Sequence, residues 1–378
     1  MVLPLLLHGK HGRPGAPEVL YDTLAGWIVP WRFTSFDDEY LALRSSDGLV
    51  DASTLAAVAC QGDDRTEFLH RILTNEVRSL TPGAGCRAAL LTAQARLLAE
   101  LLVLADADQF LLLCQLPRAD RVLQELEHYH FTERITLANL ERQQAALAIQ
   151  GPRTMEALSR LFGLVLALPQ ASDHALAAWE GVPVRVVRHS LAGGEVGVLL
   201  LTPAEHAVAV WDALQREGAS AGLKPVGWEA LNAARIEAGL PWEPADLTDE
   251  PLLPETGLET VAVSGTKGCY IGQEIVARVE TYGSVNRRLM RLAVDGDTAP
   301  QPGDAIRWNG EEAGRVTSAC WSPARQRPLA FGYVKRGAYE PGTRVEIVRA
   351  GAALPAVVDA PPFKKGDVSI FPTPQQEK

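Results

Sequence analysis

The segment from Lys267 to Glu274 places a cation, a thiol, an aromatic ring, a carboxamide and a carboxylate within eight residues. Its sequence is Lys267-Gly268-Cys269-Tyr270-Ile271-Gly272-Gln273-Glu274. The apolar run 261–263 predicts a strand before this segment, and residues 273–279 predict the first turns of a helix after it. The reactive side chains are therefore expected on a connecting loop, which is where binding and catalytic residues are often found.

Cys269 is the candidate reactive thiol of this loop. A thiol near a helix N-terminus and two residues from Lys267 lies in a positive field, which favours the nucleophilic thiolate. We therefore predict that Cys269, Lys267, Gln273 and Glu274 form a catalytic group. The alternative is that Cys269 is a small buried hydrophobic residue, as free cysteines commonly are. The two flanking glycines favour the reactive interpretation, because they allow a sharp turn or a close approach by a partner.

Composition excludes several classes of protein. A chain of 378 residues that is 47% hydrophobic can bury a large core in two or three domains. The formal charge of −10 gives no overall attraction to nucleic acid. Five cysteines without a C-x-x-C pair argue against a disulfide framework and a four-thiolate metal site, and favour the cytoplasm. No apolar run approaches the roughly 18 to 20 residues of a membrane span, and no metal site is predicted.

Two stretches of the chain share one pattern of a short apolar strand, a Gln-Gly turn and a helix. They centre on Gly62 and Gly151, 151 − 62 = 89 residues apart. This repeat predicts two related α+β lobes, at about 20–145 and 146–284. Short β-rich runs around Asn309-Gly310, a strong hairpin signal, predict a small β-barrel or sandwich over 285–362. We expect a mobile tail over 363–378. The acidic stretch 243–259, with three prolines, is interpreted as a solvated loop.

The octapeptide at 267–274 resembles the K-G-C-[FY]-x-G-Q-E signature of the YgfZ family of folate-binding proteins. The segment 235–241 resembles R-x-E-A-G-x-P, which that family shares with the glycine-cleavage aminomethyltransferases. The resemblance implies an aminomethyltransferase-like fold of two α+β lobes over 1–284 and a C-terminal β-barrel. It also implies that the cofactor is tetrahydrofolate.

The resemblance further suggests residues for the folate site. The segment 193–197 is similar to the T-G-E-x-G motif, whose glutamate takes the pterin, so Glu195 is the first candidate; a carboxylate can accept two parallel N–H donors. Arg235 is the candidate for a folate carboxylate, and Trp228 for stacking on the pterin. The alternatives are that Glu195 is a surface glutamate, Arg235 a surface arginine and Trp228 a core tryptophan.

The sequence departs from the aminomethyltransferase pattern at Ala99-Glu100, where those enzymes have two adjacent aspartates, one of them essential. Glu100 is a further candidate for the folate site; it keeps a carboxylate but is one methylene longer, and such chemistry tolerates little misplacement. Ala192 and Cys114 also replace a tyrosine and an asparagine that the resemblance leads one to expect.

These features predict a YgfZ-like, tetrahydrofolate-dependent accessory protein. The resemblance implies that it supports the assembly or repair of iron–sulfur clusters in client enzymes, including those that modify tRNA. The first alternative is a folate-dependent aminomethyl or methyl transferase. The second is a scaffold for client proteins that no longer binds folate. Strong direct binding to nucleic acid or membranes is not expected.

Overall fold

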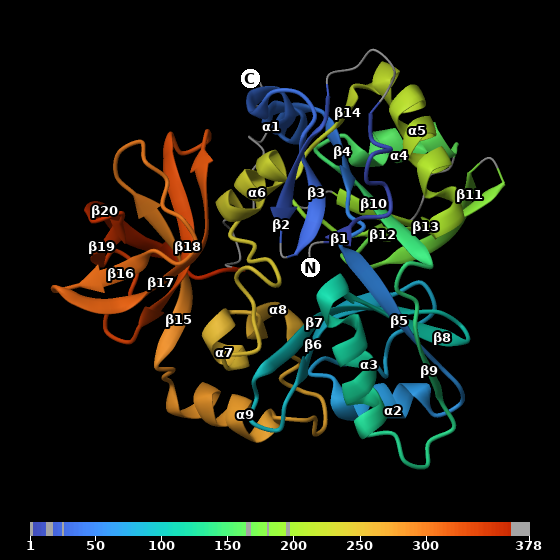
Figure 1. The fold of residues 1–378 in the computed structure, drawn as a ribbon. Helices are drawn as coiled ribbons and strands as arrows, with labels where there is room; N and C mark the ends of the chain where they lie inside the picture. The colour runs from blue at the N-terminus through green and yellow to red at the C-terminus, as the bar shows by residue number, and fades with distance from the viewer. Residues whose placement is uncertain are drawn as a thin grey trace, which may run out of the picture.

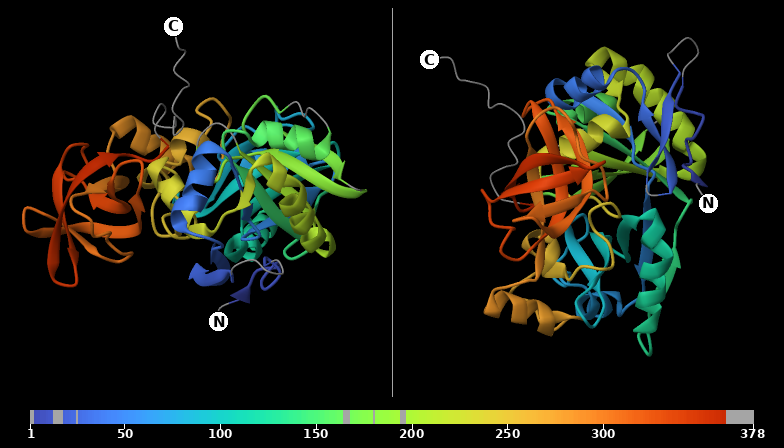
Figure 2. Two further views of the ribbon diagram at one scale, coloured as in Figure 1. Left: turned by 90° about the horizontal axis from the view of Figure 1, so that it is seen from above. Right: turned by 60° about the vertical axis from the view of Figure 1, so that its left-hand side comes forward.

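The computed structural model describes residues 3–12, 18–24, 26–163, 168–179, 181–193 and 197–363. Two α+β lobes, each built on one large sheet, lie beside a smaller β-barrel, which projects to one side of the molecule (Figures 1 and 2). The fold class predicted from the sequence is confirmed. The part of the expected tail beyond Phe363 lies outside the described residues.

The first lobe is an antiparallel five-stranded sheet covered by helices. Its strands, in spatial order, are β6 (Gly85–Leu91), β7 (Leu97–Ala105), β8 (Gln109–Gln115), β5 (Leu55–Gln61) and β9 (Thr136–Asn139). Helices α2 (Arg65–Ile72) and α3 (Ala119–His128) belong to this lobe, and η1 (Leu116–Arg118) leads into α3. The apolar face of α2, with Phe68 and Leu69, is fully buried in the same cluster as the strand residues, because its apolar residues recur at helical spacing.

The second lobe is built on a six-stranded sheet. Its strands, in order, are β11 (His174–Trp179), β12 (Val182–Arg188), β13 (Gly197–Pro203), β10 (Gln144–Gln150), β4 (Asp47–Asp51) and β14 (Leu223–Pro225). Helices α4 (Thr154–Phe162) and α5 (Ala207–Gly218) pack on it, and short helices η2 (Ala204–His206) and η3 (Ala219–Ala221) flank α5. Helix α1 (Phe36–Ser45) precedes β4, and a small sheet holds β1 (Leu3–Pro4), β3 (Trp27–Arg32) and β2 (Leu20–Leu24).

The sequence repeat corresponds to equivalent elements in the two lobes. The first copy forms β5, a turn at Gly62 and α2, and the second forms β10, a turn at Gly151 and α4. Gly62 has a φ of +109°, and a Cβ there would lie 2.1 Å from the carbonyl oxygen of Arg134. Only glycine fits both the backbone conformation and the space.

The C-terminal barrel closes with the strand order β15 (Arg287–Val294), β18 (Arg327–Lys335), β17 (Glu311–Ser322), β16 (Ala305–Trp308), β19 (Arg344–Arg349) and β20 (Ala352–Ala360). The predicted hairpin is present: β16 and β17 pair antiparallel around Asn309 and Gly310, which have φ of +53° and +84°. Positive φ at both positions is typical of a type I′ turn. Inward apolar side chains such as Ile306 and Ile347 fill the barrel.

Helix α6 (Trp228–Glu237) lies between the barrel and the lobes (Figures 1 and 2). Asn232 Nδ2 of α6 donates to the Ala319 carbonyl of β17 at 3.1 Å. The helix also carries Arg235. This contact with the barrel therefore helps to hold Arg235 and the chain that follows α6 in place.

Three short helices follow: α7 (Leu253–Thr256), α8 (Glu259–Ala262) and α9 (Gln273–Tyr282). The helix predicted from residue 273 is confirmed as α9. The strand predicted at 261–263 is wrong, since α8 occupies most of this run and its buried Ala262 packs in a core cluster. A three-residue apolar run fits one turn of buried helix as well as a strand.

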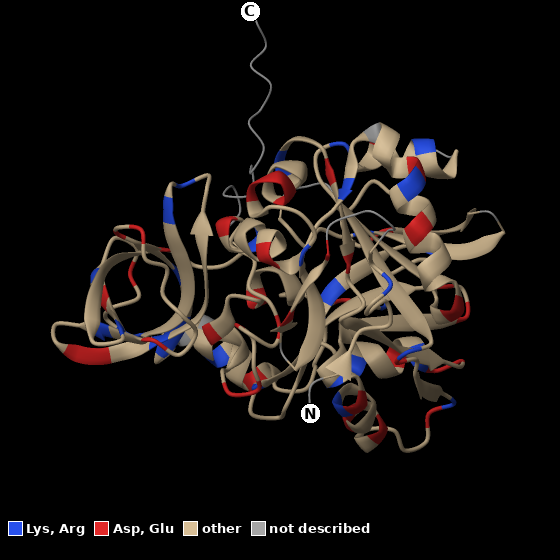
Figure 3. Ribbon diagram, turned by 45° about the horizontal axis from the view of Figure 1, so that its top comes forward, with Lys and Arg blue, Asp and Glu red and all other residues tan. Residues whose placement is uncertain are grey.

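The charged residues are interspersed. Basic and acidic residues both occur on the lobes and on the barrel (Figure 3). Within the described ranges, no helix combines the length and apolar character that crossing a membrane requires.

Candidate functional site

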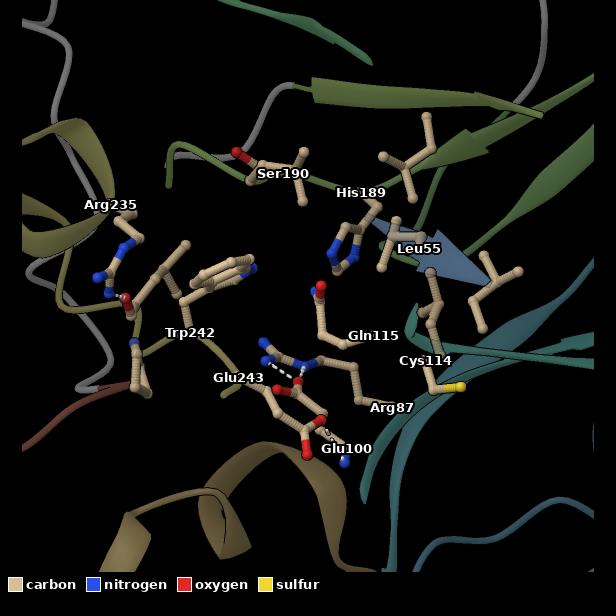
Figure 4. Close-up of a pocket in the computed structure, with 16 residues that line it drawn as sticks. Leu55, Arg87, Glu100, Cys114, Gln115, His189, Ser190, Arg235, Trp242 and Glu243 are labelled. Atoms are coloured by element: carbon tan, nitrogen blue, oxygen red, sulfur yellow. Dashed lines mark hydrogen bonds and ion pairs between the residues drawn. The ribbon is translucent and has the colours of Figure 1, made fainter. Parts of the chain in front are cut away.

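A cleft with an empty volume of about 710 Å³ lies where the first sheet, the end of β12 and the chain after α6 meet (Figure 4). We refer to it as the central cavity. The residues that line it are Leu55, Arg87, Glu100, Leu102, Leu113, Cys114, Gln115, His189, Ser190, Leu191, Leu199, Arg235, Leu240, Pro241, Trp242 and Glu243. A mostly apolar wall with a few charged groups is typical of a small-molecule site.

Glu100 lines the cavity because the side chains of β7 point alternately to the two faces of the sheet. Side chains along a strand point to opposite faces, so Glu100 and Leu102 face the cavity while Ala99 is buried in the core on the other side. The Glu100 carboxylate accepts from Arg87 Nε at 2.8 Å and also contacts Arg87 Nη2. The Phe363 ring lies 4.7 Å from the Arg87 guanidinium. Glu100 therefore lies at the predicted site, and Arg87 balances the charge of its carboxylate.

Glu243 is a cavity residue that sequence reasoning missed. It was placed in a solvated acidic loop, and that interpretation is wrong: Glu243, Asp246 and Glu255 of the stretch are all buried. Glu243 Oε1 accepts from Arg118 Nε at 2.8 Å, and Oε2 accepts from the Glu100 backbone N–H at 3.3 Å. Burial raises the pKa of Glu243 to about 8. The intervening prolines suggested exposure, and no local pattern indicates the long-range partners.

Arg235 lines the cavity, but most of its guanidinium is already bound. Its Nη1 donates to Asp246 Oδ2 at 2.7 Å and to the Leu240 carbonyl at 3.1 Å, and its Nε donates to Asn232 at 2.9 Å. These bonds fix the chain segment after α6, which carries Trp242 and Glu243. Arg235 is buried, so the alternative interpretation as a surface arginine is wrong.

Trp228 does not line the cavity. It is buried, its Nε1 donates to the Asp51 carbonyl at 3.2 Å, and its ring packs against Trp242 with centroids 4.9 Å apart. Trp228 is therefore a core tryptophan, the alternative to pterin stacking, because it lies on the inward face of α6. Trp242 is the aromatic side chain that reaches the cavity wall.

Glu195 lies outside the described residues, as do its neighbours Gly194 and Val196. The chain leading to it can be followed to the cavity: His189, Ser190 and Leu191 are part of the lining. Gln150 Oε1 accepts from the Leu191 backbone N–H at 2.8 Å. Burial, together with the charge of Arg87, lowers the pKa of His189 to about 3, so that its imidazole is neutral.

Lys267 binds the first lobe and is not paired with the thiol that it was predicted to assist. Its Nζ donates to three backbone carbonyls at the end of α2 and just beyond, those of His70 at 2.5 Å, Leu73 at 2.5 Å and Asn75 at 3.1 Å. The side chain is buried, and burial lowers the pKa of Lys267 to about 8. A cation at a helix C-terminus pairs with free carbonyls and with the negative end of the dipole. Lys267 therefore anchors the loop to the first lobe.

Cys269 is exposed on this anchored loop and is not part of the cavity lining. Gly272, with a φ of +82°, begins α9; a Cβ there would lie 2.8 Å from the Thr92 carbonyl oxygen, so glycine lets the loop seat closely on the β6–β7 turn. Gln273 is partly buried and Glu274 is exposed at the start of α9, and neither lines the cavity. The structure thus separates the four predicted catalytic residues from the cavity.

The anchoring role of Lys267 predicts a loss of stability in Lys267→Met. This variant leaves three carbonyls without their charged donor, which we expect to lower the free energy of unfolding by about 2–4 kcal/mol. Urea denaturation measures the change. The matched control is Lys224→Met, at an exposed lysine, with an expected change within about 0.5 kcal/mol. Equal stability of the two variants would contradict the anchoring role.

No group of three or more His, Cys, Asp or Glu side chains in the described ranges is arranged to hold a metal ion. The cavity instead offers fixed charges, an aromatic wall and a neutral imidazole. Such a set can bind an organic heterocycle and place charges beside it.

Comparison with known proteins gives matches along almost the whole chain. The model of the GCVT N-terminal domain matches residues 8–266, and that of the glycine cleavage T-protein C-terminal barrel domain matches residues 287–365. The chain is similar to an aminomethyltransferase of Desulforamulus reducens, with 29% identity over 368 residues that cover 96% of this chain and 98% of the relative. It is also similar to a putative chloroplastic transferase of Arabidopsis thaliana, with 30% identity over 336 residues, 87% of this chain and 74% of the relative.

A solved structure shares the fold. The crystal structure of glycine cleavage system aminomethyltransferase T from Bartonella henselae superposes with a TM-score of 0.85 at 26% sequence identity, covering 96% of this chain and 98% of that one. The arrangement of two lobes and a barrel is therefore that of the aminomethyltransferases.

Proposed function

Because the chain belongs to the glycine cleavage T-protein family, we propose that its central cavity binds a reduced folate and that the protein is a YgfZ-like accessory protein. In this role it supports iron–sulfur cluster assembly or repair in client enzymes, including enzymes that modify tRNA. The folate part rests on the fold shared with aminomethyltransferases, and the accessory part rests on the complete K-G-C-Y-I-G-Q-E segment at 267–274.

One observation carries the accessory function: Cys269 is exposed on a loop that Lys267 fixes to the first lobe. A thiol that reacted with a folate adduct would be expected among the cavity residues. An exposed thiol on an anchored loop is instead accessible to a macromolecule such as a client protein. The cavity and the thiol then serve as two separate sites, with folate in one and the client at the other.

The alternative is aminomethyl or methyl transfer to tetrahydrofolate. It is favoured by the similarity to aminomethyltransferases over nearly the full chain. The pairing of Glu100 with Arg87 is a point against it, since a carboxylate tied to a guanidinium is less free to follow a reacting group.

Calorimetric titration with tetrahydrofolate tests the folate part of the proposal. Glu195→Ala removes the carboxylate proposed to pair with the pterin donors, and unpaired donors in a partly buried site cost roughly 1–3 kcal/mol, or about 5- to 150-fold in affinity. Glu205→Ala, at an exposed glutamate of η2, is the control and should bind like the native protein. Absence of binding to the native protein would overturn the folate proposal.

The accessory part is tested in cells that lack the protein. The native chain is expected to restore the activity of iron–sulfur enzymes and the tRNA modifications that depend on them. Failure of the native chain to restore either activity, in cells where it is folded and abundant, would favour the transferase alternative.

A further inference from the structure

A buried carboxylate lies between the central cavity and the barrel. Asp246 follows the segment that lines the cavity after α6, and its side chain is fully buried. Its Oδ2 accepts hydrogen bonds from Arg235 Nη1 at 2.7 Å and from the backbone N–H of Trp242 at 3.0 Å. Arg235 and Trp242 both line the cavity, on the same side of it in Figure 4, whereas Asp246 does not. One oxygen of Asp246 therefore fixes two parts of the cavity wall.

The other oxygen of Asp246 is bound by the barrel. Its Oδ1 accepts from Thr317 Oγ1 at 2.5 Å and from Ser318 Oγ at 2.7 Å, and both residues lie on β17. The hydroxyl of Tyr333, on β18, donates to the Asp246 backbone carbonyl at 3.0 Å. Three side chains of the barrel thus converge on this one residue.

A β-bulge in β17 explains how two successive hydroxyls reach one carboxylate. Neighbouring side chains of a regular strand point to opposite faces of the sheet. The pairing of β17 with β18 shifts at this point, since Val316 pairs with Gly332 whereas Ser318 pairs with Phe331. Thr317 is the extra residue, and a bulge of this kind redirects a side chain. The irregularity of the strand therefore lies where the barrel meets Asp246.

The shared carboxylate links the barrel to the cavity wall. A buried carboxylate is stable only while hydrogen bonds replace the water that it has lost. Four donors meet this one, two from the cavity wall and two from the barrel. A displacement of the barrel removes two of these donors. The carboxylate must then move to find others, and Arg235 and Trp242 move with it.

We propose that Asp246 is a positioning residue, through which the seating of the barrel controls ligand binding in the central cavity. It acts on the ligand through Arg235 and Trp242. This inference rests on the proposed folate function and deepens it, because it gives the barrel a part in holding the folate. Coupling between two sites is reciprocal, so a bound folate should also hold the barrel more firmly against α6.

The test removes the barrel donors and leaves the cavity residues intact. Thr317→Val combined with Ser318→Ala deletes both hydroxyl groups that bind Asp246 and changes the volume of the side chains little. Titration calorimetry with tetrahydrofolate is expected to show roughly 5- to 20-fold weaker binding, in the lower part of the range that coupling between sites usually spans.

Ser322→Ala is the matched control. Ser322 is another buried residue of β17, and its Oγ donates to Glu237 Oε1 of α6 at 2.5 Å. This variant therefore loses a contact between the barrel and α6 without losing a donor to Asp246. It should bind tetrahydrofolate like the native protein, and thermal unfolding verifies that both variants are folded.

Hydrogen exchange provides a readout that a loss of stability alone does not move. Tetrahydrofolate should slow the exchange of backbone amides in β17 of the native protein, although none of the residues that line the cavity is on β17. It should not do so in the double variant. Native affinity in the double variant, an equal loss of affinity in Ser322→Ala, or unchanged exchange in native β17 overturns this inference alone. No binding of tetrahydrofolate by the native protein overturns the proposed folate function and this inference with it.

Discussion

Glycine-cleavage activity, reconstituted with the carrier and decarboxylase partners of that system, is expected to be absent or about 10²- to 10⁴-fold below that of an aminomethyltransferase. Loss of a positioned proton-handling or charge-stabilising group typically has an effect of this size. Glu100 is the carboxylate of β7 that faces the cavity, and Arg87 neutralises it. Ala99, at the place of the other aspartate, is buried on the opposite face.

A parallel reaction with an authentic aminomethyltransferase controls for the activity of the partner proteins. Turnover by this protein at about 1–10³ per second, the range of ordinary enzymes, would contradict the prediction and favour the transferase alternative. Glu100→Gln would then show whether Glu100 carries the reaction, because it keeps the shape of the side chain and removes its charge.

Local sequence patterns predicted the elements whose signals are contained within a few residues. The hairpin at Asn309-Gly310 followed from a dipeptide that accepts two positive φ values, and both are present. The equivalence of the lobes followed from two Gln-Gly turns, at Gly62 and Gly151. The barrel was implied by the family resemblance, since short β-rich runs are equally compatible with a sandwich.

The site was less predictable, because its residues are fixed by partners far away in the sequence. Lys267 seemed to belong with its neighbour Cys269, yet its partners are carbonyls almost 200 positions earlier. Glu243 was expected to be solvated, yet Arg118 and Glu100 hold it buried in the cavity. Trp242, and not Trp228, reaches the cavity wall, because α6 turns Trp228 inward.

Alkylation with a limiting amount of iodoacetamide near pH 7 is expected to mark Cys269 first, with the other four cysteines at least 100-fold slower. Burial raises the pKa of Cys60, Cys86 and Cys320 to about 12 each, and raises that of Cys114 as well. At a pKa of 12 only about one thiol in 10⁵ is the reactive thiolate at pH 7. Cys269 is the one cysteine with an exposed side chain in the described structure. Peptide mass mapping identifies the labelled residue, and urea-unfolded protein, in which all five should react, is the control.

The same thiol is expected to be necessary for the cellular role. Cys269→Ser should fold and bind tetrahydrofolate like the native protein, because Cys269 lies outside the cavity lining, yet it should not restore iron–sulfur enzyme activity in cells that lack the protein. Cys86→Ser is the matched control, since it exchanges a partly buried sulfur of β6 for oxygen, and it should restore the activity. Full restoration by Cys269→Ser, or first labelling of any other cysteine, would mean that the thiol has no part in the function. The lysine, glycines and aromatic ring of this loop would then serve only to fasten α9 to the first lobe through Lys267.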